Sequence, residues 1–213
     1  MIDQGPAFTF NAERHEYHVG TRIVPHCTGI VASGGMVSYR YVDADLLEYK
    51  TELGREVHRA CDLHNRNTLG KYDERVKPHL HAWISFKENC KSFTLISSEY
   101  QCVATVNGMT YGMRLDCNAR VDGYDTMIEI KIGKVYPHHG IQLAGQAMGA
   151  PYPKLTDPLA KFMFRRRMVV ELRANGTPKV HPFNERSDYE AFVSLLYITC
   201  WKQRFANTYK ENQ

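Results

Sequence analysis

Hydrophobic and polar residues alternate along most of the segment from residue 92 to residue 133. This alternation predicts β-strands, because successive side chains of a strand point to opposite faces of a sheet. The pattern is interrupted at Asn107-Gly108 and at Asp122-Gly123. Both dipeptides favour tight turns between antiparallel strands. We therefore expect a β-meander of three strands, over residues 95–106, 109–121 and 126–132.

Hydrophobic residues recur at three- and four-residue spacings in other segments, which is typical of the buried face of a helix. This spacing predicts helices over residues 43–65, 77–90, 139–148 and 187–209. Either Asp43 or Asp45 would cap the first of them. We expect hairpins over residues 8–24 and 162–183, and a flexible connection over the glycine-containing residues 28–35.

The order of these elements predicts the class of fold. Two helices precede the meander, and a helix, a hairpin and a closing helix follow it. Such an order indicates an α/β or α+β domain, in which a central mixed β-sheet with an antiparallel meander is flanked by helices. A chain of 213 residues can form one sizeable core without requiring a second. We expect a single domain, comprising an N-terminal hairpin and connection (1–42), a core (43–150) and a C-terminal hairpin and helix (151–213).

Composition and charge narrow this interpretation only slightly. Hydrophobic residues make up 43% of the chain and charged residues 23%, as in an ordinary soluble protein. The net charge of +4 is compatible with a polyanionic partner, although such an excess is more often a solvated basic face. There is no CxxC pair among the six cysteines, no signal-peptide pattern and no apolar run of the ~18 residues that span a membrane. These features predict a cytoplasmic protein with reduced cysteines and no membrane association.

The third predicted strand carries the most informative charges. Alternation places Ile128, Ile130 and Ile132 on one face, and Glu129 and Lys131 together on the other. Three isoleucines require burial, so an acid and an amine would lie side by side on an interior strand, where charge is costly unless satisfied. The plainer alternative is an amphipathic strand with a solvated polar face on which the two charges pair.

Asp116 favours a functional site over that alternative. The turn at residues 122–123 folds its strand back beside Glu129, so the two carboxylates are expected to share one face of neighbouring strands. Two carboxylates and a backbone carbonyl form a suitable oxygen site for Mg²⁺ or Mn²⁺. A lysine beside such an ion could orient an attacking water or stabilise charge on a phosphate, as phosphodiester hydrolysis requires.

The spacing of these residues resembles a known signature. Twelve residues separate Asp116 from the tripeptide Glu129-Ile130-Lys131. This arrangement resembles the D…(D/E)xK motif of the PD-(D/E)XK nuclease superfamily. Further motifs between residues 51 and 149 follow in the family's order and resemble its RecB-like and phage lambda-type exonuclease branch. They are a GxxxH helix motif from Gly54 to His58, the acid Glu99 on the first meander strand, and Gln142 at the start of the helix that follows the lysine strand. Before this stretch, Thr28-Gly29 also resembles the short Thr-Gly segment that often precedes the family's GxxxH helix.

The resemblance implies a restriction-endonuclease-like core and a divalent-metal site. Asp116, Glu129 and the Ile130 carbonyl would hold Mg²⁺ or Mn²⁺, with His58 as a further ligand. Taken alone, a histidine on such a helix is more often a packed, hydrogen-bonded core residue, and Gly54 one turn earlier makes the two interpretations comparable.

The resemblance also assigns roles beside the metal. Lys131 would position the water, and Glu99 would bind a second metal or orient water. Gln142 would hold the lysine or a DNA phosphate. The implied activity is hydrolysis of DNA, as an exonuclease of phage recombination or DNA repair. The implied partners are linear duplex or single-stranded DNA, a phage single-strand annealing protein and further copies of the chain. Two alternatives stay open: a non-catalytic nucleic-acid-binding protein of this fold, and a hydrolase of another phosphate ester.

Several positions depart from the family pattern. Gln146 stands where RecB-like nucleases have a tyrosine, and Gly112 lies four residues before Asp116, one more than usual, which suggests a bulge or a shifted register. Only Cys200 lies near the C-terminus, which argues against the four-cysteine iron–sulfur cluster of some members. The arginines at 165–167, with Lys154 and Lys161, could follow a phosphate backbone or form a solvated sheet edge.

Overall fold

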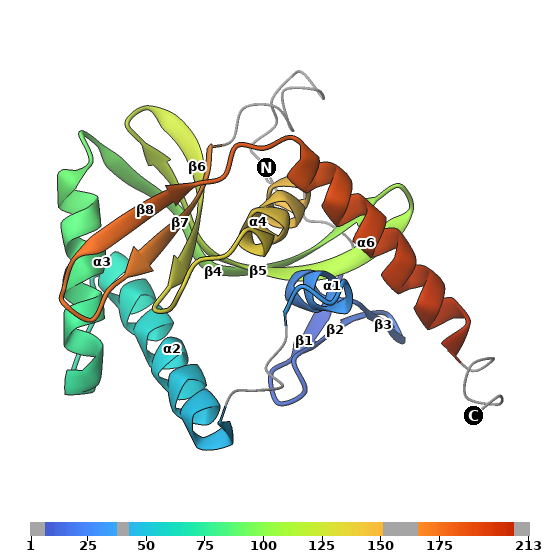
Figure 1. The fold of residues 1–213 in the computed structure, drawn as a ribbon, viewed down its shortest axis with the longest axis horizontal. Helices are drawn as coiled ribbons and strands as arrows, with labels where there is room; N and C mark the ends of the chain where they lie inside the picture. The colour runs from blue at the N-terminus through green and yellow to red at the C-terminus, as the bar shows by residue number, and fades with distance from the viewer. Residues whose placement is uncertain (1–6, 38–42, 151–165, 207–213) are drawn as a thin grey trace.

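Helices cover both faces of a five-stranded β-sheet in a computed structural model of the chain (Figure 1). The structure describes residues 7–37, 43–150 and 166–206. Neighbouring strands are antiparallel except for β6 and β7, which are parallel, so the predicted mixed sheet with an antiparallel meander is confirmed. In spatial order, the strands are β4 (Phe93–Val106), β5 (Met109–Val121), β6 (Tyr124–Lys131), β7 (Arg166–Leu172) and β8 (Pro178–Pro182).

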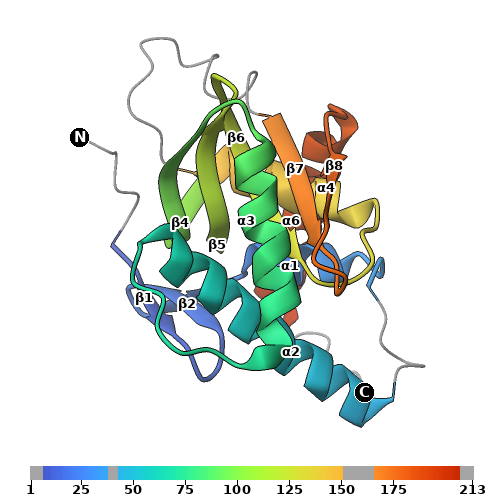
Figure 2. The same cartoon turned by 90° about the vertical axis from the view of Figure 1, so that its left-hand side faces the viewer.

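The central strand β6 is buried on both of its faces. Ile128 and Ile130 pack into a hydrophobic core with α2 and α3, while Met127 packs into a second core with α4 and α6. Figure 2 shows α2 and α3 in front of the sheet and α4 and α6 behind it. The α-helices of the described ranges are α1 (Cys27–Ser33), α2 (Ala44–Asn65), α3 (Lys77–Asn89), α4 (His138–Gly149) and α6 (Ser187–Arg204).

The predicted α2, α3 and α4 are confirmed, with ends that differ by one residue at most. Asp43 is the residue that caps α2, because its Oδ1 accepts a hydrogen bond from Leu46 N at 3.0 Å. The closing helix ends at Arg204, earlier than predicted, and residues 207–209 of that prediction lie outside the described ranges. The C-terminal hairpin is present as β7 and β8, and residues 162–165 of its first predicted strand also lie outside those ranges.

The prediction of a flexible connection over residues 28–35 is wrong, because most of this segment forms helix α1. Cys27, Ile30 and Val31 lie on one face of the helix and are buried against the core that contains α4 and α6. The His26 ring accepts a hydrogen bond from Gly29 N at 3.2 Å and caps the helix. Glycines lie near both ends of the segment, so its short apolar pattern did not predict a helix. The helix is stable because its apolar face is buried.

The N-terminal segment forms three strands where a hairpin was predicted: β1 (Thr9–Asn11), β2 (Glu16–Val19) and β3 (Arg22–Val24). This small antiparallel sheet packs on β5, where the buried Tyr17 ring lies directly over Gly112. Gly112 N also donates to the Pro25 carbonyl at 2.8 Å. The predicted bulge at Gly112 is wrong, since its pairing with Val103 is regular. Gly112 instead provides the close approach that the Tyr17 ring needs, and the register shift lies at residues 95–97.

Gly112→Ala is expected to loosen this contact. A Cβ at position 112 would overlap the Tyr17 ring, and an overpacked site of this kind typically costs about 1–3 kcal/mol of the free energy of unfolding. The midpoint of urea unfolding would measure the loss. Gly70→Ala is the matched control, because a Cβ there meets no atom within 4 Å. Equal midpoints for the two variants would contradict the proposed contact.

Arg167 is buried in the core, so both interpretations of the arginine run at 165–167 are wrong for this residue. Its side chain is 2% exposed and donates to the Gly140 carbonyl at 3.0 Å and the Glu185 carbonyl at 2.8 Å. Its Nη2 also lies 3.1 Å from Asp188 Oδ2. Arg167 thereby joins β7 to both α4 and α6. Arg165, Lys154 and Lys161 lie outside the described ranges.

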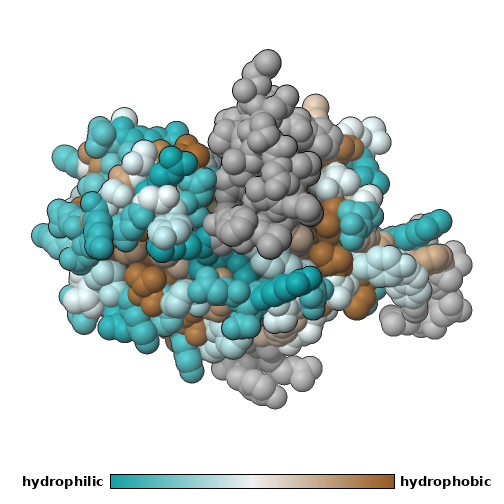
Figure 3. Space-filling model, turned by 90° about the horizontal axis from the view of Figure 1, so that it is seen from above, coloured by the Kyte–Doolittle hydropathy of each residue, from teal (hydrophilic) through white to brown (hydrophobic). Residues whose placement is uncertain are grey.

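The surface seen from above is mainly hydrophilic, with hydrophobic residues in small, separate groups (Figure 3). No helix within the described ranges combines the length and the apolar character that a membrane crossing needs.

Candidate functional site

Strands β5 and β6 separate at Asp116 and open a fork in the sheet. Their pairing extends from Val121 opposite Tyr124 to Cys117 opposite Ile128, and no further. Beyond that point the buried Asp116 carboxylate takes the place of a neighbouring strand, because its Oδ2 accepts the Ile130 N–H at 2.8 Å. The Ile130 carbonyl faces the same side of β6 as its N–H, since both point in one direction along a strand. The fork therefore brings a carboxylate and a backbone carbonyl together.

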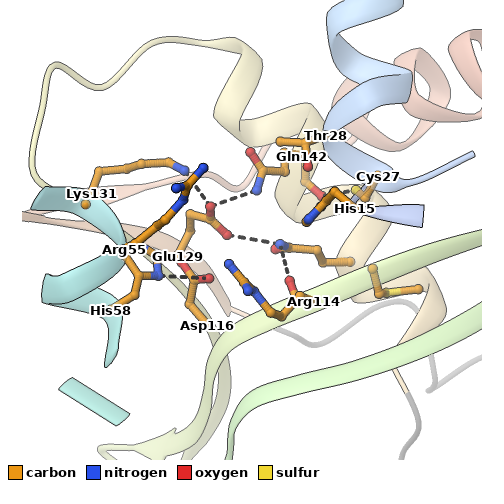
Figure 4. A pocket seen from close by; sticks show the side chains of 13 residues that line it. His15, Cys27, Thr28, Arg55, His58, Arg114, Asp116, Glu129, Lys131 and Gln142 are labelled. Atoms are coloured by element: carbon orange, nitrogen blue, oxygen red, sulfur yellow. Dashed lines mark hydrogen bonds and ion pairs between the residues drawn. The ribbon is translucent and has the colours of Figure 1, made fainter. Parts of the chain in front are cut away.

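Three side chains from different elements meet at this fork. His58 of α2, Glu99 of β4 and Asp116 of β5 each offer one ligand atom, and these atoms all lie within 4.8 Å of one another. His58 Nδ1 lies 3.3 Å from Glu99 Oε1 and 3.4 Å from Asp116 Oδ1. Its other ring nitrogen, Nε2, lies 3.1 Å from the Ile130 carbonyl oxygen. Figure 4 shows His58 pointing from its helix toward Asp116.

An unusual backbone conformation accompanies the position of Glu99. Its φ of 47° lies in the left-handed region, which residues with a side chain rarely adopt within a strand. The flanking pairs, Ser98 with Cys117 and Tyr100 with Leu115, place it opposite Asp116. Its carboxylate is held at both oxygens, Oε1 near His58 and Oε2 at 3.0 Å from Arg114 Nε. Such strain persists where surrounding contacts determine a residue's position, and it is concentrated at functional sites.

The two acids make His58 strongly basic. Burial by itself would lower the pKa of His58, but Asp116 and Glu99 outweigh it and raise the pKa from 6.5 to about 10. The imidazole is therefore charged at neutral pH and neutralises part of the acidic cluster. A metal ion ligated by Nδ1 would replace the proton on that atom, since a histidine binds metal in its neutral form.

Glu129 occupies the α4 side of the same pocket and is 3% exposed. Its Oε1 accepts hydrogen bonds from Lys131 Nζ at 2.6 Å and from Gln142 Nε2 at 2.7 Å. Its Oε2 accepts one from Gln146 Nε2 at 3.0 Å. Gln146 also donates to the Arg114 carbonyl at 3.2 Å. Gln146 thus anchors the Glu129 carboxylate, one helical turn after Gln142.

The structure therefore divides the predicted site residues into two groups. His58, Glu99, Asp116 and the Ile130 carbonyl converge at the fork. Glu129, Lys131 and Gln142 form a hydrogen-bonded group beside it, in the same cavity. The role of Glu129 as a metal ligand stays a prediction, and Glu99 lies among the candidate ligands.

The cavity has a volume of about 230 Å³ and includes residues that the sequence analysis did not select. Arg114 precedes Asp116 by two residues, so alternation alone could have placed it on the same face. Arg55 directly follows Gly54, the glycine of the GxxxH motif on α2. His15 carried no such signal in the sequence, and it lies in the turn between β1 and β2. Burial lowers the pKa of His15, and the positive charges of Arg114 and Arg55 lower it further.

The donors at the fork fit a hard divalent cation. Asp116 uses Oδ2 for the Ile130 N–H, and Glu99 uses Oε2 for Arg114, so each carboxylate turns its second oxygen toward His58. These two oxygens and the imidazole nitrogen Nδ1 form a predominantly oxygen set, and the Ile130 carbonyl lies beside the other ring nitrogen, Nε2. Carboxylate and carbonyl oxygens suit Mg²⁺ and Mn²⁺. The residues present therefore fit either ion.

Comparisons with known proteins do not assign a family. The chain matches no family model and no curated protein. Among solved structures, the crystal structure of SSO0001 is similar, with a TM-score of 0.37 and 20% sequence identity. The alignment covers 59% of this chain and 57% of that chain, so this chain spans little more than half the length of its structural match.

Proposed function

We propose that the protein is a Mg²⁺- or Mn²⁺-dependent deoxyribonuclease that hydrolyses phosphodiester bonds in DNA. The convergence of His58, Glu99, Asp116 and the Ile130 carbonyl at a fork beside Lys131 carries this proposal. The resemblance to PD-(D/E)XK nucleases of the RecB-like and phage lambda-type branch supports it and favours an exonuclease of phage recombination or DNA repair.

Each group of residues has a distinct role in this proposal. The fork residues would hold the ion, which, when bound, polarises a phosphoryl oxygen and stabilises the negative charge of the transition state. Lys131 orients the attacking water and donates a hydrogen bond to the developing charge. Glu129 holds the lysine amine at 2.6 Å, and it is itself held by the amides of Gln142 and Gln146. This support keeps the ammonium group in one position, as efficient catalysis requires.

Removal of metal tests the proposal directly. Linear DNA incubated with the protein and Mn²⁺ is expected to be degraded, and degradation should stop with EDTA and resume when excess Mn²⁺ is added. Gel electrophoresis of labelled DNA would measure the rate. Absence of degradation under every metal condition would overturn the proposal. In that case, tight DNA binding would favour the non-catalytic alternative, whereas hydrolysis of small phosphate esters would favour a different phosphoesterase.

A further inference from the structure

The cavity is lined by two cationic side chains, Arg55 and Arg114, that the proposed hydrolysis does not use. Asp116 and Glu129 line the cavity with two carboxylates, and Glu99 adds a third beside His58, while Arg55, Arg114 and Lys131 line it with three cations. In a DNA strand each phosphodiester carries one negative charge, so a strand bound for hydrolysis brings a second phosphate next to the scissile one. Lys131 and the ion serve the scissile phosphate, so the second phosphate needs another partner.

Arg114 is placed to provide it. Its Nε is engaged by Glu99 Oε2 at 3.0 Å, which fixes the plane of the guanidinium group. The side chain is 39% exposed, and in Figure 4 its terminal nitrogens point into the pocket. A guanidinium group carries five N–H donors, so the terminal amino groups remain able to make a two-pronged contact with a phosphate. Its ion pair with Glu99 therefore orients Arg114 without using all its donors.

Arg55 reaches the same space from the opposite side of the cavity. It extends from α2, one turn before His58, and Figure 4 shows its guanidinium group above the carboxylates. Its side chain is exposed, and it makes no hydrogen bond or ion pair with any residue in the described ranges. Its neighbour Arg59 on the same helix lies outside this cavity. A cation of this kind, at the mouth of a charged pocket, suits a mobile anionic ligand better than a structural contact.

We propose that Arg55 and Arg114 form a clamp for a second phosphate of the DNA strand, next to the phosphate that is hydrolysed. This inference rests on the proposed function, since it names a subsite of the same pocket. Such a clamp would make catalysis depend on the charge of a neighbouring internucleotide linkage. It would fix the strand in register with Lys131 and the metal donors.

Two variants and two controls test the clamp. Arg55→Ala removes one cation, while Arg114→Lys retains a charge for Glu99 but loses the planar fork. Each is expected to lower kcat/KM for Mn²⁺-dependent cleavage of a linear oligonucleotide about 10- to 100-fold, the usual range for a hydrogen bond to a charged group. Arg59→Ala, from the next turn of α2, and Arg120→Gln, from the same face of β5 and paired with Asp125 at 2.9 Å, should leave kcat/KM nearly unchanged.

Charge-neutral methylphosphonates distinguish a phosphate clamp from a structural role. A series of oligonucleotides would each carry one such linkage, moved one position at a time. At the clamped position the methylphosphonate should lower the activity of wild type, and it should lower the activity of each variant by a smaller factor, because only one arginine is left intact there. If each variant lost the same factor as wild type at every methylphosphonate position, or if the variants were as active as the controls, the clamp would be overturned.

If the wild-type protein binds DNA without cleaving it, the proposed function fails on its own. The clamp is then tested by the salt dependence of the dissociation constant. Arg55→Ala should reduce the slope of log K against log salt by about one, whereas Arg114→Lys keeps its charge and should leave the slope nearly unchanged; an unchanged slope for Arg55→Ala would overturn the clamp.

Discussion

Replacing Lys131 by alanine is expected to lower kcat for Mn²⁺-dependent DNA cleavage about 10³-fold, within the range that a positioned proton-transfer or charge-stabilising group provides. The ammonium group lies in the same cavity as the fork and is held by Glu129 at 2.6 Å, so the substitution removes a positioned cation from the site. Mn²⁺ binding should be retained, because Lys131 is not a ligand. Steady-state kinetics and a calorimetric Mn²⁺ titration would measure the two properties separately.

Two further variants control this experiment. Lys134→Ala removes an exposed lysine from the loop after β6, and its kcat should stay close to that of wild type. Asp116→Asn should lose both cleavage and Mn²⁺ binding, because it removes a carboxylate from the fork. If Lys131→Ala cleaved DNA at the wild-type rate, the assigned role of the lysine would be wrong even if the activity itself were present.

Arg167→Met is expected to lower the free energy of unfolding by about 3–5 kcal/mol, the usual cost of removing one partner of a buried ion pair. The substitution would leave Asp188 without its cation and the Gly140 and Glu185 carbonyls without a donor. The contact with Asp188 Oδ2 is an ion pair rather than an aligned hydrogen bond, so most of the expected loss comes from the stranded charge and the carbonyls. Denaturant-induced unfolding followed by circular dichroism would measure the change.

The adjacent arginine offers a matched control. Arg166 is partly exposed and stacks over the Tyr124 ring at 3.7 Å, so Arg166→Met should change the free energy of unfolding by less than about 1 kcal/mol. Adding Asp188→Leu to Arg167→Met should restore part of the lost stability by removing the unpaired acid. Equal losses for Arg166→Met and Arg167→Met would show that Arg167 does not have the proposed role.

Features set by neighbouring residues could be predicted well. Asn107, Gly108, Asp122 and Gly123 all have positive φ, as expected for the tight turns that join the meander strands. Strand alternation correctly separated the buried isoleucines of β6 from Glu129 and Lys131. Helix α2 begins after one of the two predicted caps, Asp43. In each case the signal lies within a few residues of the structure that it determines.

Features that depend on distant contacts were missed or left undecided. Helix α1 is helical because its apolar face is buried, and Gly112 is needed because the Tyr17 ring lies on it. Arg167 is part of a charged run in the sequence, yet its partners come from residues 140 and 185–188. Periodicity carries no information about such partners, because they approach only when the helices pack on the sheet.

The candidate site shows the same division. The sequence by itself determined that Glu129 and Lys131 share a face of an interior strand and that Asp116 lies on the strand beside it. Only the tertiary structure decided that Glu99 and His58 join Asp116 at the fork, and that Gln142 and Gln146 support Glu129. It also brought Arg55, Arg114 and His15 to the same cavity. The physical reason is that strand alternation is a property of the local backbone, whereas a pocket is formed by side chains from elements that meet only through packing.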